Sequence, residues 1–255
     1  FSQAYESDSF SDTVNKSSFR DVILRGARVR GQIALIGANV TGTLNGDTLQ
    51  AGDLFLRSDY AGDGDNGITS IAGSTNLVFA RIGSNLDLRG ATLADVDLSG
   101  ATINGELRLG FSGGKVTTWQ DKDGHPSTLN ARTTSIGTVS DAQSAWTATG
   151  RLRLARVSIG HLGGFDGDTA KRMRDRGMDW WDDWARRDPD FSPAPYTQLA
   201  SAFASMGDRD AANDIRFLGR AREREARCAE SLWGGSCISL FAQEYIVGFG
   251  INPYT

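Results

Sequence analysis

The stretch from Leu86 to Leu109 constrains the fold more than any other part of the sequence. It repeats in blocks of five, with Gly, Asp, Asn or Thr between bulky aliphatic residues at Leu88, Leu93, Leu98 and Ile103. A single amphipathic helix would need apolar residues at i+3 and i+4, and one long strand would need unbroken alternation. The five-residue period therefore predicts short extended segments separated by turns, stacked as a solenoid in which each coil covers the next.

A looser spacing extends the pattern on both sides. Similar residues recur eleven positions apart near the start of the chain, as Val29 and Val40 do, and the pattern returns in RLRLARVSIGHL from Arg151. Glycine is frequent, with 31 of 255 residues, which favours many tight turns. The expected solenoid covers residues 19–165. It follows an N-terminal arm (1–18) and carries loop insertions at 58–74, 111–129 and 138–148.

Helical spacing replaces the five-residue period from residue 166. Ser192 followed by Pro193 is a helix start signal, with serine at the N-cap and proline in the first turn. The last coil of a solenoid would leave unpaired backbone and an open core unless it were covered. We therefore expect residues 166–255 to form an α-helical cap that ends in an apolar tail.

The expected fold class is mainly β: a right-handed parallel β-helix, or pentapeptide-like solenoid, with a C-terminal α-helical capping bundle. Leu86–Leu109 resembles the pentapeptide-repeat family. The run PYTQLASAFASMGDRDAA from Pro195 is similar to helices of bacterial membrane-associated repeat proteins. This resemblance implies a right-handed β-helix with a helical cap, and it implies no catalytic residues.

Charge, hydropathy and missing motifs exclude several classes of function. The formal net charge of −4 at pH 7 argues against a broad nucleic-acid-binding surface. No apolar run reaches the roughly 18 residues of a membrane-spanning helix. The sequence contains no Gly-rich phosphate loop, Ser-His-Asp order or CxxC motif. We therefore expect no enzymatic activity, no catalytic residues and no cofactor site.

An acidic loop is the candidate metal site. Asp59, Asp63 and Asp65 fall in the run DYAGDGDNG, and hard oxygen ligands on a flexible loop suit Ca²⁺. The EF-hand spacing is absent, however, and Asp, Asn and Gly are equally typical of a solvated turn. Both interpretations, a weak calcium site and a turn, stay open.

Two groups of residues in the helical region are candidates for contact with a partner. The first is aromatic, alternates with aspartates, and comprises Trp180, Trp181 and Trp184. Its pattern fits a sugar-binding surface or a core stripe beside an acidic face. The second is a basic ridge of Arg216, Arg220 and Arg224. This ridge fits an acidic partner, an anionic lipid surface or a solvated helix face.

Cys228 and Cys237 are nine positions apart and flank a Gly-Gly turn, so a disulfide between them is geometrically feasible. The chain begins at Phe1 without Met, so we expect an upstream segment such as a signal peptide. Together these features favour a bacterial protein that is exported, periplasmic or membrane-associated.

The expected function is that of a non-enzymatic scaffold for protein–protein interaction, as the soluble part or a subunit of a membrane-associated complex. The first alternative is a carbohydrate-binding or carbohydrate-active protein. It requires carboxylates clustered on one face, and the outward candidates are Asp53, Asp87, Asp95 and Asp97. The second alternative is a DNA mimic, against which the weak net charge argues.

Overall fold

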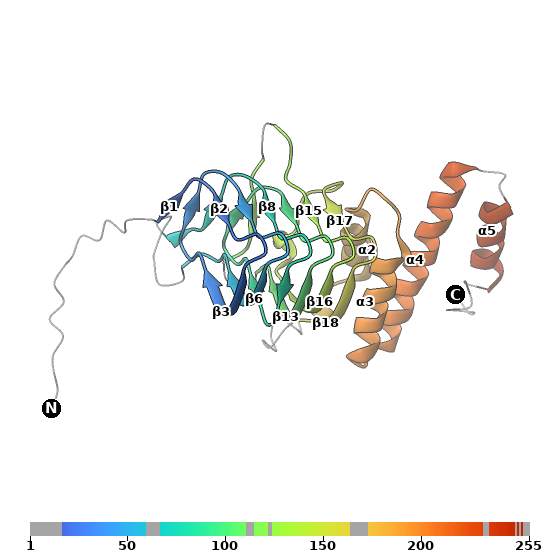
Figure 1. The fold of residues 1–255 in the computed structure, drawn as a ribbon. Helices are drawn as coiled ribbons and strands as arrows, with labels where there is room; N and C mark the ends of the chain where they lie inside the picture. The colour runs from blue at the N-terminus through green and yellow to red at the C-terminus, as the bar shows by residue number, and fades with distance from the viewer. Residues whose placement is uncertain are drawn as a thin grey trace, which may run out of the picture.

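The computed structural model describes residues 17–59, 67–110, 115–121, 124–163, 173–231, 235–247, 249 and 251. Three parallel β-sheets lie along one axis, and helices follow at one end of them (Figure 1). The chain visits the sheets in turn, so that strands inside a sheet pair with strands from the passes before and after them.

The sheets have five, six and seven strands among the described residues. The five-stranded sheet contains β1 (Ser18–Phe19), β4 (Asn39–Val40), β7 (Ser70–Ile71), β11 (Thr92–Leu93) and β14 (Thr118–Trp119). The six-stranded sheet contains β2 (Val22–Ile23), β5 (Leu44–Asn45), β8 (Thr75–Asn76), β12 (Val96–Asp97), β15 (Leu129–Asn130) and β17 (Leu152–Arg153). The seven-stranded sheet contains β3 (Arg28–Ala34), β6 (Gln50–Phe55), β9 (Arg81–Ile82), β10 (Leu86–Asp87), β13 (Thr102–Arg108), β16 (Ser135–Ser140) and β18 (Ser158–Leu162).

The expected fold class is wrong. The described chain has an α/β fold, with three large parallel sheets and four α-helices, and it is not a right-handed β-helix of the pentapeptide-like solenoid type. A pentapeptide repeat would space the passes evenly. Instead, 21 residues separate Ile82 from its partner Ile103, and 33 separate Asp97 from its partner Asn130.

The strand lengths give the physical reason for this correction. The seven-stranded sheet contains strands of six and seven residues, such as β6 and β13, which exceed a five-residue block. β7 and β14 begin inside the predicted insertions 58–74 and 111–129, and β16 ends inside the third, 138–148. The five-residue period therefore describes one stretch of the chain, while segments of unequal length set the spacing of the other passes.

Aliphatic side chains in register form the core between the sheets. Leu54, Leu86 and Leu107 lie side by side on neighbouring strands and are fully buried. Val40 and Ile71 pair in the same way in the five-stranded sheet. Burial of each such side chain contributes about 1.5–3 kcal/mol, so these ladders hold successive passes together.

Strands of the six-stranded sheet share one type of turn. A side-chain oxygen in the second strand residue accepts a hydrogen bond from the backbone N–H two positions later, over 2.8–3.3 Å, at Asn45, Asn76, Asp97 and Asn130. Three positions after each of these residues the backbone has positive φ, at Thr48, Phe79, Gly100 and Thr133. Asn and Asp favour such turns, which accounts for their recurrence at these positions.

Among the described residues, four α-helices follow the sheets, and the short 3-10 helix η2 (Gln143–Ala145) lies between β16 and β17. Their bounds are α2 (Met178–Arg186), α3 (Pro193–Ser205), α4 (Arg209–Glu230) and α5 (Gly235–Val247). The predicted start of α3 is confirmed, because Ser192 caps it and accepts a hydrogen bond from the Ala194 N–H. Asp208 caps α4 in the same way, through the Ala211 N–H at 3.0 Å. The predicted division at residue 165 lies between β18 and α2, at a position outside the described ranges.

The segment after α2 accepts hydrogen bonds from backbone N–H groups at the outer edge of β17, the last strand of its sheet. The Leu154 N–H donates to the Asp188 carboxylate at 2.7 Å, and the Gly150 N–H donates to the Arg187 carbonyl at 2.8 Å. Asp188 is itself buried, and α3 packs on β18. The helical ends of the six- and seven-stranded sheets are therefore covered.

Candidate interaction surfaces

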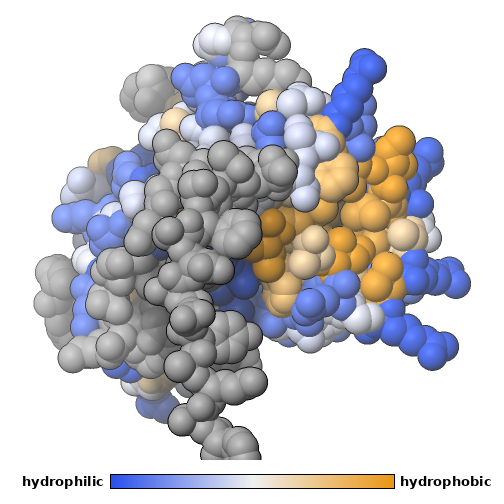
Figure 2. Space-filling model, turned by 90° about the vertical axis from the view of Figure 1, so that its left-hand side faces the viewer, coloured by the Kyte–Doolittle hydropathy of each residue, from blue (hydrophilic) through white to orange (hydrophobic). Residues whose placement is uncertain are grey.

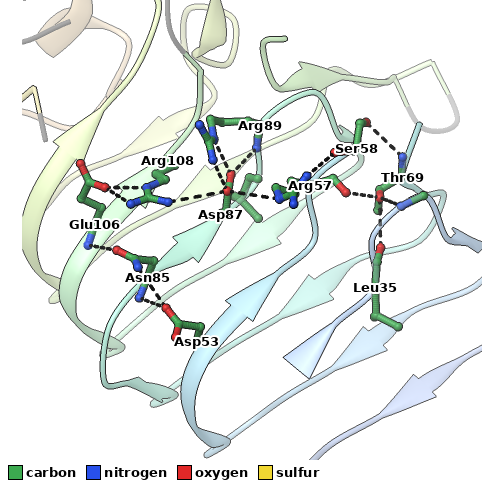
Figure 3. Close-up of polar contacts among 12 residues, drawn as sticks. Leu35, Asp53, Arg57, Ser58, Thr69, Asn85, Asp87, Arg89, Glu106 and Arg108 are labelled. Carbon is green, nitrogen blue, oxygen red and sulfur yellow. Dashed lines mark hydrogen bonds and ion pairs between the residues drawn. The ribbon is translucent and has the colours of Figure 1, made fainter. Parts of the chain in front are cut away.

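A network of charged side chains covers part of the seven-stranded sheet (Figure 3). At its centre is Asp87 on β10, which is almost fully buried. Its Oδ1 accepts from Arg89 Nε at 2.8 Å, and its Oδ2 lies 3.8 Å from Arg57 Nε and 4.0 Å from Arg108 Nη1. These arginines come from β13 and from the chain just after β6 and β10. Asp87 therefore joins three passes of the chain.

The network continues to neighbouring acidic and amide side chains. Glu106 on β13 accepts from Arg108 Nε at 2.5 Å, and its backbone N–H donates to Asn85 Oδ1 at 3.1 Å. Asn85 Nδ2 in turn donates to Asp53 Oδ1 at 3.0 Å. Three arginines and three carboxylates balance in formal charge, so these groups are engaged mainly with one another.

Buried hydroxyl groups close the base of the acidic loop. Ser58 Oγ donates to the Gly90 carbonyl at 2.5 Å and accepts from the Thr69 N–H at 3.1 Å. Thr69 Oγ1 bonds to the Leu35 and Arg57 carbonyls at 3.0 and 2.6 Å (Figure 3). These bonds fix both ends of the loop, and the Asp59 N–H also pairs with the Gly67 carbonyl at 2.7 Å.

The predicted calcium ligands fall largely outside the described ranges. Asp59 is exposed, and its carbonyl accepts from Lys115 Nζ at 2.5 Å. Asp63 and Asp65 are not among the described residues. Within the described part of the chain, no group of three or more His, Cys, Asp or Glu side chains is arranged to hold a metal ion.

The outward aspartates named for the carbohydrate alternative occupy different places. Asp53 and Asp87 belong to the network of Figure 3. Asp95 accepts from the Thr128 N–H at 2.8 Å. Asp97 accepts from the Ser99 N–H in a turn of the six-stranded sheet. The four carboxylates therefore do not form one site.

A buried ion pair joins the sheets to the helices. Arg176 donates to both carboxylate oxygens of Asp141, at 2.7 and 3.2 Å, and both side chains are almost completely buried. The Trp146 indole N–H also donates to Asp141, and the Arg176 guanidinium lies 4.3 Å from the ring centre of Trp180. Burial raises the pKa of Asp141, although the bonds from Arg176 and Trp146 oppose this shift.

The predicted tryptophan group lies mainly inside the protein. Trp181 and Trp184 are buried and pack edge-on against Phe203 and Trp146, with ring centres 5.6 and 5.2 Å apart. Trp180 is half-buried beneath Arg176. The first two rings therefore hold α2 in the core and offer little surface to a partner.

The predicted basic ridge on α4 is partly neutralised. Arg216 bonds to Asn213 at 2.9 Å, Arg220 pairs with Glu223 at 2.8 Å, and Arg224 pairs with Glu244 at 2.8 Å. The two ion pairs, with Glu223 and Glu244, reduce the positive field that an acidic partner would meet.

Helix α5 has an exposed apolar face and a covalent tie to α4. Ile238, Phe241, Tyr245 and Ile246 are all exposed, while Cys228 and Cys237 form a disulfide with a sulfur–sulfur distance of 2.01 Å. A pocket of about 520 Å³ lies beside this disulfide, between α4 and α5. No described helix is long and apolar enough to cross a membrane.

The disulfide is expected to stabilise the attachment of α5 rather than the whole fold. Replacing both cysteines with serine removes the cross-link that closes a short loop. In the chain-entropy model this cross-link contributes about 2–3 kcal/mol to stability. We expect faster amide hydrogen exchange in α5 and unchanged exchange in the buried strands. Faster exchange in both regions would contradict this local role.

The end of the sheets opposite the helices carries an apolar patch (Figure 2). We call this surface the open end and define it by the exposed Phe19, Ile23 and Ile36 and the partly buried Val22, Leu24, Ile33 and Leu35. Ile23 is 75% exposed. In deeper passes the equivalents of the partly buried residues are covered, as Leu44 and Leu54 are. The open end therefore exposes side chains of core type.

Each sheet also terminates at the open end in a strand that has one described neighbour. These strands are β1, β2 and β3, which pair with β4, β5 and β6 respectively. In β2 and the residue after it, Val22 and Leu24 donate to the Thr43 and Asn45 carbonyls at 2.9 and 2.6 Å. Because backbone direction alternates along a strand, the N–H and C=O of Ile23 point to the opposite edge.

No protein-family model, curated protein or solved structure matches this chain. The resemblance to pentapeptide-repeat proteins and to bacterial membrane-associated repeat proteins is therefore corrected. No family model supports it, and the three parallel sheets, built from unevenly spaced passes of the chain, form an α/β fold with the helices.

Proposed function

We propose that this chain is a non-enzymatic scaffold that holds a partner protein at its open end. The partner would contribute an extended segment with apolar side chains and acidic flanks. The observation that carries the proposal is the difference between the two ends of the sheets. The six- and seven-stranded sheets are covered at the helical end, whereas side chains of core type are exposed at the open end.

The backbone of the open end supports strand addition. An unpaired strand edge is a template for another strand, and proteins usually cover or interrupt such edges. Among the described residues, β1, β2 and β3 have no further strand on their outer side. A partner segment could pair with β2 at Ile23 and cover the apolar side chains beside it.

The charges around the open end favour an acidic partner over a second copy of this chain. Residues 17–47 contain four arginines, Arg20, Arg25, Arg28 and Arg30, and two aspartates, Asp21 and Asp47. Arg20 lies 3.7 Å from Asp21, and Arg25 lies 3.2 Å from Asp47. The net positive charge would repel a second copy and attract carboxylates.

A peptide selection on the immobilised full chain tests this proposal. We expect a displayed library of random peptides to yield apolar sequences with acidic flanks. Replacing Ile23 with aspartate should weaken their binding at least tenfold. The new carboxylate would be buried under the bound peptide and would repel its acidic flanks. The measurement is the Kd of the purified peptide by fluorescence anisotropy.

Ile246→Asp on α5 is the matched control, because Ile246 is 77% exposed and Ile23 is 75% exposed. This variant should bind the peptide as the parent chain does. Equal weakening by both substitutions would contradict the proposal. So would binding seen only after removal of residues 1–16, since the chain's own segment would then be the occupant of the open end.

A further inference from the structure

We propose that a groove across β3, β6 and β9 binds an extended anionic polysaccharide. We call it the arginine groove. It has a volume of about 440 Å³, and its polar lining residues are Arg28, Arg30, Arg81, Gln50 and Asn104. This proposal concerns a sheet face and a different class of ligand from the scaffold function, although Arg28 and Arg30 also contribute to the positive charge near the open end.

The arginines are placed in register by the sheet. Arg28 pairs with Gln50, which pairs with Arg81, while Val29 and its partners occupy the next, core-facing row. Adjacent strands lie about 4.8 Å apart, so two strand spacings, or about 10 Å, separate the Arg28 and Arg81 backbones. The row therefore presents two positive charges with an amide between them.

These arginines differ from those of the network in Figure 3. Arg57, Arg89 and Arg108 approach Asp87 or Glu106. By contrast, Arg28, Arg30 and Arg81 are exposed and make no ion pair with the described residues. No carboxylate lines the arginine groove. Guanidinium groups bind carboxylate and sulfate through paired N–H donors, so the groove is suited to anions.

Gly83 gives the arginine groove an open floor. Gly52 also lines the groove, but a methyl group there would lie 2.8 Å from the Gly31 carbonyl oxygen. The Gly83 N–H is already satisfied by the Ala51 carbonyl at 2.9 Å. A methyl group built on Gly83 would come no closer than 3.6 Å to other atoms. The space above this glycine is therefore free for a ligand, and the amides of Gln50 and Asn104 can bond to sugar hydroxyls.

The lining favours a sugar chain over a nucleic acid. Proteins that bind single strands combine basic grooves with aromatic side chains on which bases stack, and no aromatic residue lines the arginine groove. The formal net charge of −4 also gives no broad basic surface for a duplex. Anionic groups at intervals along a hydroxyl-rich chain match the arginines and amides.

Titration of the full chain with defined oligosaccharides tests this inference. The probes are a hyaluronan hexasaccharide, which carries carboxylates, a heparin hexasaccharide, which carries sulfates as well, and neutral dextran. We expect at least one anionic probe to bind, with affinity that falls as salt rises. The carboxylate and sulfate probes together identify which anion the groove prefers.

Substitutions then assign the binding to the arginine groove. Arg81→Gln and Arg28→Gln should each raise the Kd about tenfold, as expected for loss of a charged hydrogen bond. Gly83→Ala, which leaves the charge unchanged, should raise the Kd because its methyl group fills space that the sugar would occupy. Arg209→Gln, at an exposed position on α4, and Ile23→Asp at the open end should leave it unchanged.

Three outcomes would overturn the inference. They are no binding of either anionic probe at low salt, a Kd that Arg81→Gln does not change, and tighter binding of oligo(dT) than of both sugars. Loss of peptide binding in Ile23→Asp with sugar binding retained would separate the two proposals from each other.

Discussion

Replacing Arg176 with methionine is expected to lower the Tm by about 10 °C at pH 7. Removing one partner of a buried ion pair costs about 3–5 kcal/mol, because the other charge stays buried. In a chain of this size, each kcal/mol shifts the Tm by about 2–4 °C. Methionine retains most of the volume of the arginine stem, so the lost charge dominates the effect.

The effect of Arg176→Met should depend on pH. Burial raises the pKa of Asp141 above its usual 3.8, so the folded protein holds this proton more tightly than the unfolded chain does. The contribution of Asp141 to stability is therefore most favourable at low pH and is lost as pH rises through the folded-state pKa. In the Arg176→Met variant the guanidinium no longer opposes burial, so the pKa of Asp141 should rise further. The loss of stability relative to the parent chain should therefore be smaller at pH 4.5 than at pH 7.

The double variant Asp141→Asn/Arg176→Met is the control for this experiment. It removes both charges, while the asparagine oxygen can still accept from the Trp146 indole N–H. We expect it to recover part of the lost stability at pH 7 and to show no comparable dependence on pH. Urea unfolding at several pH values measures both effects. A deficit in Arg176→Met that is the same at every pH would contradict the role assigned to Asp141.

Replacing Gly137 with alanine is expected to destabilise the fold by about 3 kcal/mol, at the upper end of overpacking effects. A methyl group at this position would lie 2.2 Å from the Asn104 carbonyl oxygen and 2.8 Å from that of Gly105. Both atoms belong to β13, which pairs with β16 in the core of the seven-stranded sheet. Neither backbone can yield without breaking this pairing.

Gly83→Ala is the matched control in the same sheet. Its methyl group would meet no atom closer than 3.6 Å, and the loss of chain entropy in the unfolded state should make the change neutral or slightly stabilising. Chemical denaturation of the two variants compares them directly. Equal midpoints for Gly137→Ala and the parent chain would show that the contact between β13 and β16 is looser than described.

The five-residue period could predict which side chains face the core but not the fold class. Leu88, Leu93, Leu98 and Ile103 are all buried as the pattern requires. The class was missed because the pairing of passes depends on the lengths of the segments between them, which the local period does not contain. β14, for example, begins inside a predicted insertion.

The candidate sites divide in the same way. Helix caps such as Ser192 are local and could be read from neighbouring residues. The pairing of Asp141 with Arg176 spans 35 positions and has no local signal. Arg57 and Arg89 did have a local signal, because each follows an L-x-L run. The first leucines of the two runs are 32 positions apart and pair in register.

Hydrogen–deuterium exchange with the tightest-binding selected peptide tests the central claim most directly. If the open end accepts an added strand, the peptide should slow exchange of the Ile23 amide and of amides along the outer edges of β1 and β3. Exchange in α5 should not change. Protection confined to α5, or no protection of β2, would contradict the proposal that this protein is a scaffold acting through its open end.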